Sequence, residues 1–145
     1  MKQSIVVLFC VMSCLLTSCT DNSNLSGNWK FNISNYKNTC GGKPTVSKII
    51  HLVQNDKLLT ATIDVQGDNG KKYTGTFQGK LTQLNFPTKT TLHGKFKVAD
   101  FTTKEIIIGK FLDNKTFSGK SKWTSTSDDK KMVCKGSQTI DGNKQ

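Results

Sequence analysis

The sequence predicts an all-β fold, a single eight-stranded antiparallel up-and-down β-barrel. Apolar and polar residues alternate with period two from Trp29 onward, as expected for strands with one buried face. Clusters of turn-forming residues interrupt the alternation at nearly regular intervals, so the connections are short. Short connections between eight strands favour a sheet closed on itself, and a two-sheet sandwich with similar strands is the alternative.

The first predicted strand sets the pattern for the others. Trp29, Phe31 and Ile33 face one way, and the polar residues between them face the other. A long loop over Asn35–Thr45 follows this strand. The remaining strands are predicted over 46–54, 58–65, 72–84, about 92–98, 105–112, 117–123 and 132–140.

Glycine recurs on the face of these strands that carries the aromatic residues. The positions are Gly75, Gly79, Gly94, Gly109 and Gly119. Because glycine normally weakens a strand, its repetition on the inward face indicates tight curvature at bends of a barrel.

The N-terminal segment carries an export signal. Lys2 precedes an apolar run over 5–16 that is too short to span a bilayer. Leu16-Thr17-Ser18-Cys19 then resembles the lipobox of bacterial lipoproteins, in which the cysteine thiol receives a diacylglycerol and the chain is cut before it. An ordinary secretory signal is the alternative, but cleavage after Ser18 would put the large Leu16 where a small residue is wanted.

The lipobox resemblance implies an address and a domain division. Residues 1–18 would be the lipoprotein signal peptide, 19–26 a lipidated tether and 27–145 the β-barrel domain. The lipid on Cys19 would hold the protein to a membrane of the bacterial cell envelope. Thr20, rather than aspartate, after the cysteine looks like the outer-membrane class.

A second resemblance concerns the barrel. Leu25-Ser26-Gly27-Asn28-Trp29 resembles the Gly-x-Trp opening of lipocalin-like (calycin) barrels, in which the tryptophan closes one end. That family implies eight strands with a lid in the long first connection. Avidin-type barrels open similarly, but Trp29 and Trp123 are the only tryptophans here, so their biotin-stacking residues have no counterpart.

Cys40 and Cys134 remain once the signal and Cys19 are set aside. In an oxidising envelope this even remainder predicts a disulfide, with two free thiols as the alternative. His51 and His93 are not spaced with either cysteine as in a zinc motif, so no metal or other cofactor is expected.

The chain is strongly basic. Its 21 basic residues are all lysines, against ten acids, and the formal net charge is +11. This surface would attract anionic lipid or glycan by charge alone, although it is equally the composition of a merely solvated surface. The lysines are dispersed and arginine is missing, so no specific nucleic-acid binding is expected.

The sequence favours binding over catalysis. No histidine has an acid or nucleophile placed to form a triad, so no catalytic residues and no enzyme activity are expected. We expect a small apolar or amphipathic ligand beneath the Asn35–Thr45 loop. A filled barrel acting as a structural, surface-interaction or inhibitor module of the envelope is the alternative. The candidate ligand-binding residues are Trp29 as the barrel floor and Tyr73, Phe77, Phe96 and Trp123 as the wall.

Overall fold

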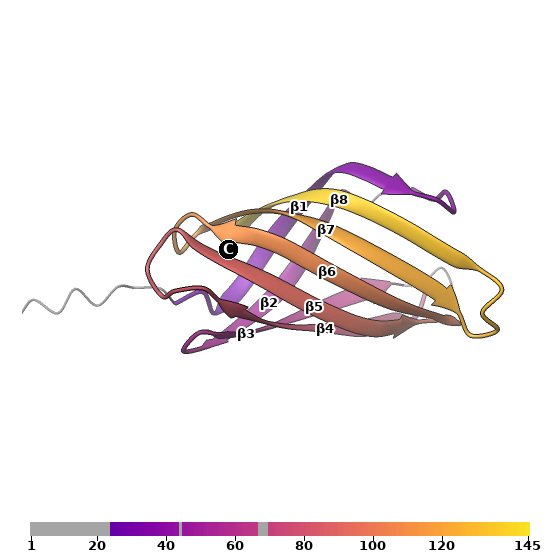
Figure 1. Cartoon of the computed structure of the whole chain (residues 1–145), viewed down its shortest axis with the longest axis horizontal. Helices are drawn as coiled ribbons and strands as arrows, with labels where there is room; N and C mark the ends of the chain where they lie inside the picture. Colours follow the sequence, from indigo (N-terminus) through magenta and orange to yellow (C-terminus); the bar gives the residue numbers. More distant parts are fainter. Residues whose placement is uncertain (1–23, 44, 67–69) are drawn as a thin grey trace, which may run out of the picture.

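The computed structural model describes residues 24–43, 45–66 and 70–145, which form a closed antiparallel barrel (Figure 1). Consecutive strands pair around the barrel, and the first pairs with the last, so the predicted up-and-down barrel is confirmed. The proposed lipidation site Cys19 and the signal segment lie outside the described residues, which contain no helix long and apolar enough to cross a membrane. The strands are β1 (Gly27–Asn38), β2 (Ser47–Asn55), β3 (Leu58–Gln66), β4 (Lys72–Leu81), β5 (Thr88–Val98), β6 (Phe101–Phe111), β7 (Thr116–Ser127) and β8 (Val133–Lys144).

One end of the barrel is closed by Trp29. Its side chain is fully buried, and its indole Nε1 donates a 2.8 Å hydrogen bond to the carbonyl oxygen of Leu25. The indole meets the ring of Phe111 nearly edge-on, with centroids 5.2 Å apart. Leu25 is itself fully buried, although the sequence placed it in the tether. The barrel core therefore begins two residues before the predicted domain boundary at Gly27.

Glycines on one strand make room for aromatic rings that pack against their backbone. A Cβ atom added to Gly94 would lie 2.5 Å from the ring of Phe77, its cross-strand partner. One added to Gly142 would lie 2.6 Å from the ring of Phe31. These glycines are thus required by close packing of rings on backbone as well as by curvature. The same arrangement joins Gly75 to Phe96, Gly109 and Gly119 to Phe117, and Gly136 to Trp123.

The first connection is shorter than predicted. The sequence assigned Asn35–Thr45 to a loop, but β1 continues to Asn38 and pairs with β8 across this stretch. An irregularity between Ser34 and Lys37 shifts the register, and Asn35 takes a φ of 50°. Asparagine tolerates this left-handed conformation, so the strand bulges and continues where the alternating pattern breaks.

A disulfide between Cys40 and Cys134 ties the remaining loop to the beginning of β8, as predicted. The two Cα atoms are 5.4 Å apart. The backbone N–H of Thr39 donates to the carbonyl of Lys135 at 3.0 Å, and the Thr39 hydroxyl accepts from the Lys135 N–H at 2.9 Å. The loop after β1 is therefore fixed to the wall of the barrel at one side.

Candidate functional site

The end of the barrel opposite Trp29 is hollow. A cavity of about 580 Å³ opens between the end of β1, the beginning of β2, the end of β3, the β5–β6 hairpin and strands β7 and β8. Below it the barrel is packed, and a void there amounts to only about 10 Å³. That void holds at most about one water molecule, whereas the upper cavity has the size of a small-molecule site. The barrel is thus filled in the half that contains Trp29, its lower half, and hollow in the other half, its upper half.

The floor of the cavity is polar and is built on Glu105 of β6. Only 5 % of this residue is exposed. Its Oε1 atom accepts hydrogen bonds from the Ser121 hydroxyl on β7 and, at 3.4 Å, from Nε2 of Gln138 on β8. The same Gln138 nitrogen lies 3.3 Å from the Ser121 hydroxyl oxygen. Three neighbouring strands therefore hold one carboxyl group in a fixed orientation.

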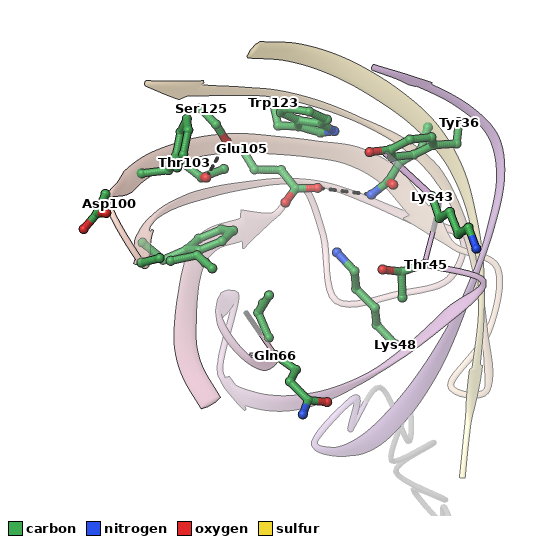
Figure 2. A pocket seen from close by; sticks show the side chains of 16 residues that line it. Tyr36, Lys43, Thr45, Lys48, Gln66, Asp100, Thr103, Glu105, Trp123 and Ser125 are labelled. Atoms are coloured by element: carbon green, nitrogen blue, oxygen red, sulfur yellow. Dashed lines mark hydrogen bonds between the residues drawn. The ribbon is translucent and has the colours of Figure 1, made fainter. Parts of the chain in front are cut away.

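The second oxygen of Glu105 faces the cavity. Oε2 accepts no hydrogen bond from a described residue. No fully buried side-chain oxygen or nitrogen in the described part of the chain lacks a partner, so Oε2 must still be accessible from the cavity. In Figure 2 the carboxyl group points into the cavity. An incoming hydrogen-bond donor can therefore reach it.

Lys48, at the beginning of β2, points into the same cavity from the opposite wall (Figure 2). The ion pairs among the described residues are Lys97–Asp128 and Lys131–Asp129, so Lys48 and Glu105 face each other without forming one. The two remaining charged residues of the described lining, Lys43 and Asp100, lie at the rim. The described lining thus carries two lysines and two acids, although the whole chain is strongly basic.

An aromatic wall stands beside the carboxyl group of Glu105. The rings of Tyr36 and Trp123 stack with centroids 6.5 Å apart and an interplanar angle of 30°. Trp123 can lie flat against the wall because its cross-strand partner is Gly136, which leaves room for the indole. Phe96 lines the cavity as well and contacts Phe77 below it at a centroid distance of 5.8 Å.

The rim on the β5–β6 side is held by an ion pair. The Lys97 ammonium lies 2.7 Å from the Asp128 carboxylate, and the Asp128 N–H donates to the carbonyl of Asp100 at 2.8 Å. The hydrogen bond and the charge of Asp128 raise the pKa of Lys97. These contacts join the β5–β6 hairpin to the loop between β7 and β8, so two edges of the opening are held together.

The predicted ligand-binding residues divide between the cavity and the core. Phe96 and Trp123 line the cavity. Phe77 and Trp29 are fully buried in the packed half, and Tyr73 is half-buried on β4 opposite Val65, outside the described lining. The sequence pattern gives the inward face of a strand but not the height along the barrel, so it could not separate these groups.

Sequence reasoning missed the polar residues of the site. Glu105, Gln138 and Ser121 lie on three different strands, and only the barrel register brings them together. A sequence signal did exist, because Glu105 alternates in step with the inward Ile107 and is the only glutamate of the chain. The described residues contain no group of three or more histidine, cysteine or acidic side chains that could hold a metal.

Comparison of the chain with protein-family models, curated proteins and solved structures finds no match.

Proposed function

We propose that this chain is a lipid-anchored lipoprotein of the bacterial cell envelope whose barrel binds a small amphipathic ligand at its open end, without catalysis. The observation that carries the binding proposal is the cavity of about 580 Å³ at the end of the barrel opposite the packed half that Trp29 closes. Ligand sites of this size typically combine apolar and aromatic walls with a few placed polar groups. Tyr36, Phe96 and Trp123 supply such walls, and Glu105 supplies the polar group.

The polar floor of the cavity favours one of the two expected classes of ligand, apolar or amphipathic, over the other. An apolar chain inserted to the bottom of the cavity would cover Glu105 Oε2 and leave a desolvated acceptor without a donor, which is costly. A ligand that places a polar group on the floor avoids this cost. We therefore favour an amphipathic ligand that enters with its polar end first and rests its apolar part on Phe96 and the Tyr36–Trp123 pair.

The binding proposal predicts that filling the cavity removes ligand. Ser125 lines the cavity, so Ser125→Phe places a ring in the opening. We expect the full-length protein to form a one-to-one complex with lysophosphatidylethanolamine in native mass spectrometry, and we expect Ser125→Phe to weaken it at least about tenfold.

Thr124→Phe is the matched control, because Thr124 is the adjacent residue of β7 and pairs with Lys104 and Lys135 on the outer side of the wall. This variant should bind as the unchanged protein does. Equal binding by both variants, or no complex with any lysolipid or fatty acid, would contradict a ligand-binding role.

The anchoring proposal rests on the lipobox resemblance at Leu16–Cys19. Replacing Cys19 with serine removes the thiol that would receive the diacylglycerol. The expected result is transfer of the protein from the detergent phase to the aqueous phase in a phase-partition experiment, with loss of labelling by a palmitate analogue. A variant that partitions and labels like the unchanged protein would show that Cys19 carries no lipid.

One observation favours the alternative role of a surface-interaction module. Ile106 and Ile108 are exposed on the outside of β6, with exposed fractions of 41 % and 60 %. Lysines of β5, β6 and β7 surround them, including Lys89, Lys110 and Lys120, and the outer wall is hollowed there. An anionic surface would be attracted to this face by the charge of the lysines, whereas the cavity at the open end of the barrel lies between its strands.

A further inference from the structure

We infer that the ligand of the cavity at the open end of the barrel is zwitterionic: an ammonium group binds Glu105 Oε2, and an anionic group a few bonds away binds Lys48. This inference rests on the proposed binding function and specifies the chemistry that the cavity selects. The observations behind it are an almost fully buried carboxyl group with one oxygen open to the cavity, and a lysine that points at it from the opposite wall without pairing.

The ammonium position follows from the surroundings of Glu105. Oε1 is already occupied by Ser121 and Gln138, so a new donor must approach Oε2 from the cavity. An ammonium group is the strongest donor for this position, because hydrogen bonds between charged partners are shorter and stronger than neutral ones. The Tyr36–Trp123 pair stands beside the carboxyl group, and aromatic faces attract organic cations.

The anionic position follows from Lys48. This side chain is half-buried, and its ammonium group has no hydrogen-bond or ion-pair partner among the described residues. A ligand that brought only a positive charge to Glu105 would be repelled by Lys48, and one that brought only a negative charge would be repelled by Glu105. A zwitterion satisfies both groups at once. Because its net charge is zero, the balance between the two lysines and the two acids of the described lining is unchanged.

Two sources share this chemistry: a free zwitterion, such as phosphoethanolamine or an amino acid, and the headgroup of an amphiphile.

The experiment compares four ligands on the full-length protein by tryptophan fluorescence, with Trp123→Phe as the control for the origin of the signal. They are lysophosphatidylethanolamine, lysophosphatidylglycerol, phosphoethanolamine and palmitate. We expect lysophosphatidylethanolamine to bind at least about tenfold more tightly than lysophosphatidylglycerol, which has the phosphate but no ammonium group. Binding of phosphoethanolamine alone would identify a small-molecule site, and its failure to bind would assign the ligand to lipids.

Two variants test the two ends of the ligand separately. Glu105→Gln keeps an oxygen for Ser121 and Gln138 but removes the charge, so it should abolish the preference for the ethanolamine headgroup. Lys48→Met should weaken both phosphate-containing lysolipids by a similar factor, about tenfold, and it remains informative if Glu105→Gln fails to fold. Asp141→Asn and Lys30→Met remove matched charges from exposed positions on β8 and β1 and should change nothing.

The outcomes separate the two proposals. Equal affinity for the ethanolamine and glycerol lysolipids, or a preference that survives Glu105→Gln, would overturn the zwitterion inference while the binding function stands. Binding of palmitate with full affinity would overturn it as well. Absence of binding by every ligand would overturn both.

Discussion

Replacing Trp29 with alanine is expected to lower the free energy of unfolding by about 3–5 kcal/mol. Trp29 is the largest fully buried side chain at the closed end of the barrel, and its loss leaves a cavity between Leu25 and Phe111 that rigid strands cannot close. The hydrogen bond from its indole to the Leu25 carbonyl is lost as well. The urea dependence of unfolding, followed by circular dichroism, measures the change.

Trp123→Ala is the control for this experiment, because Trp123 is the other tryptophan and stands in the open half of the barrel. Its ring is half-buried and borders a cavity, so its removal should cost clearly less stability than removal of Trp29. A loss at Trp29 no greater than the loss at Trp123 would mean that the closed end contributes less to the fold than its burial indicates.

Removing the disulfide is expected to have an effect of similar size. The bond joins residues 94 positions apart, so it removes a large amount of conformational freedom from the unfolded chain. Replacing both Cys40 and Cys134 with alanine should lower the free energy of unfolding by about 2–5 kcal/mol. Urea denaturation of the unchanged protein with and without dithiothreitol, beside the double variant, measures the loss.

The stability of the double variant should not change with dithiothreitol. The unchanged protein, once reduced, should have a stability close to that of the double variant. Replacing Ser137 of β8 with alanine is a neutral comparison, since its side chain faces outward beside Lys122. Stability that is the same with and without the bond would show that the Thr39–Lys135 hydrogen bonds alone are enough to hold the loop.

The architecture was predictable because alternation records which side of a strand is buried. Phe31, Phe77 and Phe117 all point inward as the pattern required. The pattern failed where the backbone departs from regular geometry. At Asn35 a bulge hides the continuation of β1, and at Leu25 a single apolar residue in a polar stretch gave no periodicity to detect.

The inward placement of the glycines was predicted correctly, but the prediction gave only part of the reason for it. Their inward placement indicates curvature, which would suggest that Gly94 offers free space for a larger residue. In the structure the ring of Phe77 already fills that space. Gly94→Leu would therefore disturb the packed half of the barrel and would not fill the cavity. Whether a glycine borders free space depends on the residue opposite it on the neighbouring strand.

The candidate site was the least predictable part for the same reason. Glu105 lies 16 residues from Ser121 and 33 from Gln138 along the chain, so no local motif connects them. Each alone is an ordinary strand residue. Their chemistry appears only when three strands are placed side by side in register.

The two ends of the barrel also fix the direction in which this protein would exchange its ligand. Leu25 is buried beside Trp29 at the closed end, and the cavity opens at the opposite end of the barrel. If Cys19 carries lipid as proposed, six residues separate the lipid from Leu25, and a chain of this length spans at most about 20 Å. The closed end would then lie near the membrane, and the opening would face the aqueous compartment. The ligand would then enter from the aqueous compartment or from a partner located there. It would not enter by lateral diffusion from the bilayer that holds the protein.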